Sequence, residues 1–474
     1  MAKANETAIK NYIKELNNSF KTGDATEHTF RPALKTLLES IFENNGNTIR
    51  VLNEPKHISG IGAPDFILKE NDITLGYIET KKLNDADLQG LNINKEQFTR
   101  YKQGLENVLF TDYLTFLLYR GEELIQEVRI GNIFNNVEIK GIKDNYKSFL
   151  DLIQNFISFR GSDIESPEKL AILMAGKARL LKEKIYEALQ IDDRLQKHLK
   201  YFKDNLLNNI SDEQFSDLYS QTLVYGLFSA RINQQEQYNI KEFNKANIIE
   251  YFLPKSNPFL CNLFEFILKN ISGISWILDD LINLYSHTNL SEILSYYGSN
   301  TKTNDPIIYF YETFLSKYNP EERKKLGIWY TPKPIVDFMV RGIDYVLKHD
   351  FNLRDGLLDS SKINIETQEE DEKGKIKKTQ KSVHKLQILD PATGTGTFLA
   401  EVVRYIYSNM QQQGQIGRWQ NYVKDHLIPR LNGFELLMVS YTIALFFSHL
   451  LLSYQLNRYL IFLNYDLCNN YYLH

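Results

Sequence analysis

The chain has 474 residues, which is too long for one compact core and predicts two to four domains. Its hydrophobic fraction of 43% and charged fraction of 24% are typical of globular proteins and exclude a disordered scaffold. The 55 Lys and Arg nearly balance the 59 Asp and Glu, so a wholly basic, histone-like binder is excluded, whereas a basic cleft is not. The two cysteines, Cys261 and Cys468, are too far apart for a C-x-x-C site. They indicate a reducing compartment, and with the polar N-terminus they predict a cytoplasmic protein.

One segment is long enough to span a bilayer. Residues Leu436 to Asn457 contain no charged side chain. They do contain many hydroxyl and other polar groups, which favours a helix buried against a sheet. We therefore expect no membrane association.

The first region, residues 1–160, predicts an α/β domain. Phe30 to Phe42 has the apolar spacing of an amphipathic helix. Pro64 to Leu68 and Ile73 to Glu79 are apolar runs separated by four polar residues, a pattern typical of a β-hairpin. Tyr113 to Tyr119 and Glu127 to Ile130 predict further strands.

The second region, residues 161–318, predicts an all-α connector, since helical periodicity dominates Leu170 to Leu189, Phe215 to Phe228 and Phe259 to Leu284. The third, residues 319–474, begins with Pro332 and Pro334 in the first turn of a helix. Acidic then basic residues between positions 369 and 381 predict a solvated hairpin or loop. No G-x-x-x-x-G-K-[ST] motif occurs, which argues against a nucleotide-driven motor.

A first candidate site lies on the predicted hairpin. Asp65 begins one strand, and Glu79 and Lys81 end the other on a shared face. Two converging carboxylates repel each other unless a cation neutralises them, and Mg²⁺ prefers such oxygen ligands. Lys81 would then orient a water molecule or stabilise developing charge. The alternative is a surface hairpin whose charged ends are merely solvated.

Three more residues accompany this pattern. Glu39, on the preceding helix, could complete the metal ligands, while Gln97 and Tyr101 lie one helical turn apart after Lys81. Together the residues between about Phe30 and Arg120 resemble the PD-(D/E)xK nuclease family, in particular members with a Q-x-x-x-Y helix. The resemblance implies that Asp65, Glu79, Lys81, Gln97 and Tyr101 are catalytic. It also implies Glu39, Asp65 and Glu79 as Mg²⁺ ligands.

A second candidate site follows an apolar strand at Leu386 to Leu389. The strand runs into Asp390-Pro391-Ala392-Thr393-Gly394-Thr395-Gly396-Thr397-Phe398, and a helix follows. A strand, a glycine loop and a helix hold nucleotide-like cofactors at the carboxyl edge of a parallel sheet. Asp390 could pair with an amino group of the cofactor, and Glu435, after a second strand-like run, could bind ribose hydroxyls. The alternative is an ordinary turn.

The full string resembles motif I of DNA adenine methyltransferases, and the segment from Gly327 through Tyr330, Thr331 and Pro332 resembles their motif X. Read without that resemblance, the latter segment is a helix start capped by Thr331. Motif X before motif I is the order of the gamma group, which implies the exocyclic amine of adenine as target. The resemblance implies that S-adenosylmethionine binds a set of nine residues: Tyr330, Thr331, Pro332, Asp390, Thr393, Gly394, Gly396, Phe398 and Glu435.

Nuclease, helical connector and methyltransferase in this order resemble type IIG and the related type ISP restriction–modification enzymes, which act on double-stranded DNA. This resemblance implies an α/β multidomain protein with a PD-(D/E)xK core, an all-α connector and an incomplete Rossmann-like methyltransferase sheet. The base-clamping (N/D)-P-P-(Y/F) motif does not follow motif I. We therefore expect a truncated or split enzyme that by itself binds the cofactor weakly or not at all and does not methylate DNA. One alternative is a non-catalytic DNA-binding or regulatory subunit that needs a second chain carrying this motif and a target-recognition domain. The other is a freestanding nuclease with a methyltransferase relic.

Overall fold

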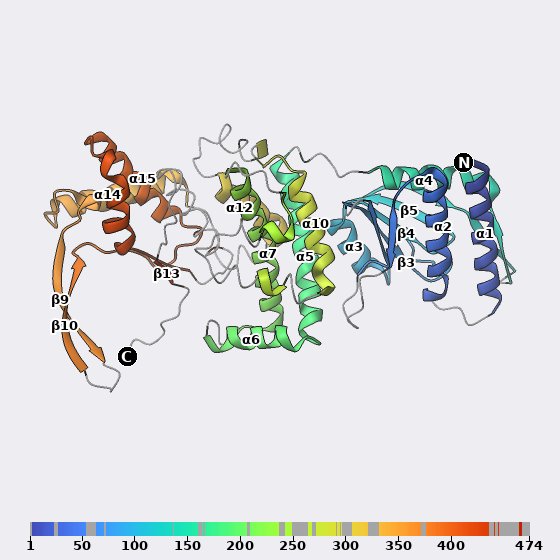
Figure 1. The fold of residues 1–474 in the computed structure, drawn as a ribbon, viewed down its shortest axis with the longest axis horizontal. Helices are drawn as coiled ribbons and strands as arrows, with labels where there is room; N and C mark the ends of the chain where they lie inside the picture. Colours follow the sequence, from blue (N-terminus) through green and yellow to red (C-terminus); the bar gives the residue numbers. More distant parts are fainter. Residues whose placement is uncertain are drawn as a thin grey trace.

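The computed structural model describes residues 2–22, 27–53, 63–70, 73–135, 137–159, 164, 166–205, 209–236, 242–248, 264–267, 272–290, 292–293, 295, 306–320, 331–370, 376–435, 440, 444 and 464–466. These residues form three successive parts along the longest axis of the molecule (Figure 1). The first is a sheet with helices on both faces, the second is a group of helices, and the third contains a smaller parallel sheet. The α/β multidomain fold predicted from the sequence is confirmed at this level.

The first part is built on a six-stranded mixed sheet with the strand order β1-β2-β3-β4-β5-β6. Its strands are β1 (Arg50–Asn53), β2 (Phe66–Glu70), β3 (Ile73–Thr80), β4 (Val108–Thr111), β5 (Thr115–Arg120) and β6 (Glu123–Arg129). All neighbouring pairs are antiparallel except β3 and β4, which are parallel. The predicted hairpin is therefore confirmed as β2 and β3. A separate antiparallel pair is formed by β7 (Gly131–Phe134) and β8 (Glu138–Gly141).

Helices cover both faces of this sheet. Side chains alternate between the faces along each strand, so Phe66 and Leu68 pack on one side and Ile67 packs on the other. The first face lies under α1 (Ala2–Lys21), α2 (Arg31–Asn45) and α4 (Tyr146–Ser158). The second lies against α3 (Lys95–Gly104) and the first helix of the next part (Figure 1). The central strands are consequently buried on both sides.

The described residues between 166 and 320 are helices and their connections. The helices are α5 (Pro167–Leu189), α6 (Asp193–Asn205), α7 (Asp212–Glu236), the single turn α8 (Lys245–Asn247), α10 (Ser275–Ser286) and α12 (Pro306–Tyr318). Helix α5 ends at Leu189 as predicted but begins three residues before the predicted Leu170. Ser166 caps it by accepting a hydrogen bond from the Lys169 amide at 3.2 Å, and Pro167 occupies its first turn. Of the predicted helix from Phe259 to Leu284, residues 259–263 and 268–271 lie outside the described residues, and α10 confirms its C-terminal part.

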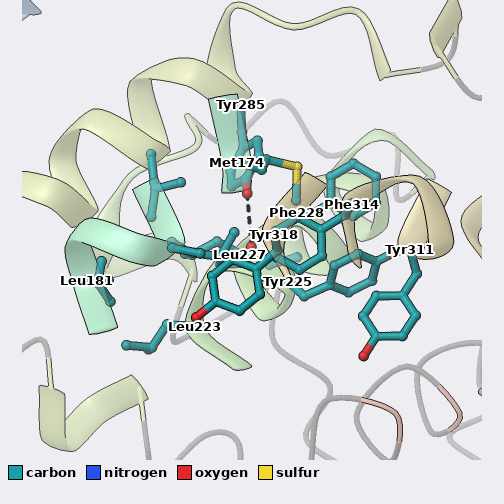
Figure 2. Close-up of a cluster of buried hydrophobic side chains, with 14 of the residues drawn as sticks. Met174, Leu181, Leu223, Tyr225, Leu227, Phe228, Tyr285, Tyr311, Phe314 and Tyr318 are labelled. Atoms are coloured by element: carbon teal, nitrogen blue, oxygen red, sulfur yellow. Dashed lines mark hydrogen bonds between the residues drawn. The ribbon is translucent and has the colours of Figure 1, made fainter. Parts of the chain in front are cut away.

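Aromatic side chains fill the centre of this helical part. Tyr225 and Phe228 of α7 contact Tyr311, Phe314 and Phe310 of α12, with ring centroids between 4.5 and 6.0 Å apart (Figure 2). Tyr285 of α10 donates a hydrogen bond to the Val224 carbonyl at 2.9 Å. The buried hydroxyl is thereby satisfied, and the contacts fix the three helices against one another.

The third part contains a short parallel sheet with the order β11-β12-β13. Its elements are α14 (Lys333–His349), β9 (Lys362–Glu370), β10 (Ile376–His384), β11 (Ile388–Asp390), α15 (Thr397–Gln412), α16 (Trp419–Tyr422), β12 (Leu431–Phe434) and β13 (Asn464–Asp466). The charged segment forms the predicted hairpin, in which β9 pairs with β10 (Figure 1).

Among the described residues, no helix has both the length and the apolar character needed to cross a membrane. Most of the uncharged segment from Leu436 to Asn457 lies outside those residues.

Candidate functional site

The hairpin of β2 and β3 brings two acidic residues together. Phe66 pairs with Ile78, so Asp65, one residue earlier, lies opposite Glu79. Both side chains are buried, with exposed fractions of 6% and 5%. The Oδ2 atom of Asp65 accepts hydrogen bonds from the Thr80 amide at 2.7 Å and the Thr80 hydroxyl at 2.5 Å. The strand end itself therefore fixes the orientation of this carboxylate.

Glu79, Lys81 and Gln97 form a closed triangle of hydrogen bonds. Lys81 Nζ donates to Glu79 Oε1 at 3.0 Å and to Gln97 Oε1 at 2.6 Å. Gln97 Nε2 donates to the same Glu79 oxygen at 2.7 Å. Gln97 comes from α3, and the other two residues come from the end of β3. The structure thus brings a helix and a strand together at one ionic cluster.

Tyr101 follows Gln97 by one turn of α3 and is buried. Burial, and then the nearby negative charge of Glu79, raises the pKa of its hydroxyl well above the usual value. The hydroxyl therefore keeps its proton and can act as a hydrogen-bond donor beside the cluster. The five predicted catalytic residues therefore lie together, three at the ends of β2 and β3 and two on α3.

Helix α2 reaches this cluster through a residue that sequence reasoning missed. Arg31, at the start of α2, forms an ion pair with Oδ1 of Asp65. Glu39, the residue proposed from that helix, instead pairs with Lys35 at 3.7 Å, and its side chain is 43% exposed. Nothing in the sequence relates Arg31 to Asp65, because the two residues are 34 positions apart and belong to different elements.

The donor set at this cluster fits Mg²⁺ in kind. Buried carboxylates from two adjacent strands and an amide oxygen are hard oxygen ligands, and Mg²⁺ commonly uses one or two carboxylates with water completing its shell. In the part of the chain that the structure describes, no group of three or more His, Cys, Asp and Glu side chains is placed to hold a metal. Arg31 and Lys81 already balance the two carboxylates, so the repulsion that suggested a metal is relieved by the chain itself.

The glycine loop forms the second candidate site. Strands β11 and β12 are parallel and end at Asp390 and Phe434, so the residues that follow both strands lie at one edge. Gly394 donates its amide to Glu435 Oε2 at 2.6 Å, and the Thr393 amide donates to the Phe434 carbonyl at 2.9 Å. The predicted strand pair and the approach of Glu435 to the loop are therefore present.

The loop has the features of a cofactor cradle. Gly394 and Gly396 adopt φ values of +56° and +87°, which side chains with a Cβ rarely tolerate. A Cβ added to Gly394 would meet nothing within 4 Å. Oδ2 of Asp390 is buried without a hydrogen-bond partner among the described residues, and burial raises the pKa of this carboxyl. An amino group of a bound cofactor would satisfy it, so these residues fit S-adenosylmethionine.

The remaining predicted cofactor residues lie around this loop or outside the described residues. Thr331 and Pro332 directly precede α14, whose Lys333 donates to Glu401 of α15 at 3.0 Å. Phe398, in the first turn of α15, packs against the core. Tyr330 and the three residues before it lie outside the part that the structure describes.

Comparison with known proteins finds similarity over part of the chain. Residues 302–426 match the family described as N-6 DNA Methylase, and a domain of this family implies S-adenosylmethionine as cofactor. The match begins at residue 302 and so includes α12. A protein of Methanocaldococcus jannaschii, named "Putative type II restriction enzyme and methyltransferase", is 23% identical over 357 residues, which cover 69% of this chain and 29% of that protein. Over the matched residues the chain is therefore similar to N-6 DNA methylases.

Two solved structures of protein–DNA complexes are also similar. A DrdV–DNA complex is 19% identical with a TM-score of 0.42, covering 98% of this chain and 40% of that one. The type ISP enzyme LlaBIII bound to DNA is 18% identical with a TM-score of 0.40, covering 67% of this chain and 18% of that one. The chain therefore spans well under half the length of the proteins that it matches.

Proposed function

We propose that this chain is a restriction–modification protein that combines a Mg²⁺-dependent DNA endonuclease with an S-adenosylmethionine site for methylation of adenine. The endonuclease lies in residues 1–160, a PD-(D/E)xK α/β core. The methyltransferase portion lies in residues 319–474, and the all-α connector, residues 161–318, joins the two. Double-stranded DNA is the substrate of both activities.

The observation that carries the nuclease is the convergence of Asp65, Glu79, Lys81 and Gln97 at one sheet edge. Asp65 and Glu79 would hold the metal ion, which supplies electrophilic assistance to the phosphodiester. Lys81 is the buried cation placed to orient a water molecule or stabilise charge on the phosphate. Gln97 holds the Lys81 ammonium in place by accepting its hydrogen bond.

Cleavage of supercoiled plasmid with Mg²⁺ tests this proposal. We expect the wild-type chain to nick or linearise the plasmid and Lys81→Ala to lose at least about 100-fold in rate, as expected for removal of one charged catalytic group. Lys82→Ala is the matched control, because Lys82 is the next residue and is exposed. The nuclease proposal fails if the wild type is inert, or if the Lys82 variant loses as much activity as the Lys81 variant.

The methyltransferase proposal rests on Asp390, Gly394 and Glu435 at the shared edge of two parallel strands. Cofactor binding is the activity that these residues support. Because no base clamp follows motif I in this sequence, we expect the chain by itself to bind the cofactor weakly and not to methylate DNA. Transfer of a labelled methyl group to adenine in duplex DNA by the purified chain would contradict this expectation.

A second candidate function is a subunit that acts with another chain. Helix α14 favours it by exposing a row of large apolar side chains, among them Phe338 at 76% and Tyr345 at 61%. The partner would carry the base clamp and a target-recognition domain. If methylation appears only when a second polypeptide with these features is added, this candidate is supported. If the chain stays monomeric and inactive in that mixture, the candidate fails.

A further inference from the structure

We propose that Arg31 competes with a divalent cation for Asp65. The cluster of Asp65, Glu79 and Lys81 is then electrically neutral while Arg31 is in place, and a metal ion binds when it displaces the guanidinium. The inference rests on the proposed nuclease function and concerns a residue with no assigned role in it. Two observations support it: the ion pair between Arg31 and Asp65, and the charge balance of the cluster.

The two oxygens of Asp65 are engaged by different groups. Oδ2 is held by the Thr80 amide and hydroxyl, so the carboxylate cannot turn away without losing both hydrogen bonds. Oδ1 faces Arg31, which therefore stands on the oxygen that is not fixed by the strand. A cation that approaches Asp65 meets the guanidinium there, and the two positive charges exclude each other.

Charge counting leads to the same conclusion. Arg31 and Lys81 supply two positive charges, and Asp65 and Glu79 supply two negative charges, so the four side chains are neutral together. A divalent cation added with Arg31 in place would leave an excess of two positive charges where Asp65, Glu79 and Lys81 are each less than 10% exposed. Concentrating charge in a poorly hydrated site is costly. Moving Arg31 outward lowers that cost.

The position of Arg31 makes such movement feasible. Its side chain is 19% exposed, whereas that of Asp65 is 6% exposed, so the arginine lies on the solvent side of the pair. Arg31 is also the first residue of α2, where no acidic residue occupies the first turn. A cation at a helix N-terminus is disfavoured by the helix dipole, so the helix does not itself hold Arg31 against the cluster.

Binding of Mn²⁺ to the full chain, measured by calorimetry without DNA, tests the inference independently of cleavage. We expect Arg31→Gln and Arg31→Met each to lower the Mn²⁺ dissociation constant about tenfold, since the positive charge paired with Asp65 is removed. Two neutral variants are used so that the effect on Mn²⁺ affinity can still be measured if one of them does not fold. Thermal melting shows whether each variant is folded. Lys35→Gln removes a charge from the same helix four residues later and should change affinity less than about twofold.

Three outcomes overturn the inference. An unchanged or weaker affinity in the Arg31 variants would mean that Arg31 does not oppose the metal. An equal gain in Lys35→Gln would assign the effect to the net charge of α2. If no protein binds Mn²⁺, or if Asp65→Asn binds it as tightly as the wild type does, the proposed metal-dependent nuclease is overturned as well. Both the inference and the proposed nuclease are supported if the wild type binds Mn²⁺, Asp65→Asn does not, and the two Arg31 variants bind it more tightly.

Discussion

Gly104 of α3 and Gly176 of α5 place two helix backbones in direct contact. A Cβ on Gly176 would overlap the Gln103 carbonyl oxygen and lie 3.0 Å from the Cα of Gly104. Lys177, the next residue, is buried, donates to the Gly104 carbonyl at 3.1 Å and forms an ion pair with Asp280 of α10. The helix that carries Gln97 and Tyr101 is therefore clamped between the sheet and the helical part.

Gly176→Ala is expected to destabilise the protein by about 1–3 kcal/mol, because the added methyl group has no room and the helices must separate. Gly342→Ala is the control. Gly342 lies inside α14, and nothing lies within 4 Å of an added Cβ. The control should therefore be stabilised by about 0.5–1 kcal/mol through reduced chain entropy. Urea unfolding of both variants measures the difference, and equal effects would contradict the clamp.

Gln97→Leu tests whether the clamped helix serves the ionic cluster. The change keeps the size of the side chain but removes one acceptor for Lys81 and one donor to Glu79, leaving two buried charges with fewer partners. We expect a loss of about 1–3 kcal/mol in unfolding free energy and a fall in plasmid cleavage of at least about tenfold. Thr99→Ala, on the exposed side of the same helix, should leave both quantities nearly unchanged. If Gln97→Leu is as stable as the wild type and cleaves plasmid at the full rate, α3 does not contribute to the site.

The hairpin that carries Asp65 and Glu79 was predictable because alternating apolar residues and a polar turn are local signals. The strand before Asp390 and the strand that ends at Phe434 were predictable for the same reason, with glycines marking the loop. The pairing of β3 with β4 was not, because parallel strands are joined by a long crossover that local patterns do not encode. Nor was the role of Arg31 at Asp65, since charged residues at helix starts carry no information about distant partners.

Asp390→Asn should separate stability from cofactor binding. Burial raises the pKa of Asp390 above the ordinary value of 3.8, so the folded protein binds this proton more tightly than the unfolded chain does. The carboxyl group therefore favours folding most below pH 3.8 and costs stability as the pH rises through its folded pKa. At neutral pH, replacing the ionised group by a neutral amide should raise the melting temperature.

The same variant should bind S-adenosylmethionine at least about tenfold more weakly, because the neutral amide removes the negative charge that pairs with the positively charged amino group. Calorimetric titration with the cofactor measures the loss. Asp425→Asn serves as the control carboxylate, since Asp425 lies on the π-helical turn after α16 rather than at the loop. A variant that is both less stable and unchanged in affinity would refute the assignment of Asp390.

His384 and His426 make the base of the β9–β10 hairpin sensitive to acid. His384 ends β10, and its Nε2 lies 3.0 Å from Nδ1 of His426, so one ring donates to the other only while the pair is not doubly charged. Burial is the main cause that lowers the pKa of both rings. Lys362 and Arg430 add to this effect, and Asp425 opposes it at His426.

Because both folded-state pKa values lie below the ordinary 6.5, the unfolded chain takes up protons first as the pH falls. Stability should therefore be fully present above pH 6.5 and decline as acidification passes 6.5 toward the folded-state values. Urea unfolding between about pH 7.5 and pH 5.5 should show this decline in the wild type. His384→Gln should flatten it, whereas His349→Gln, which changes an exposed histidine of α14, should not. An undiminished slope in His384→Gln would show that the decline arises elsewhere.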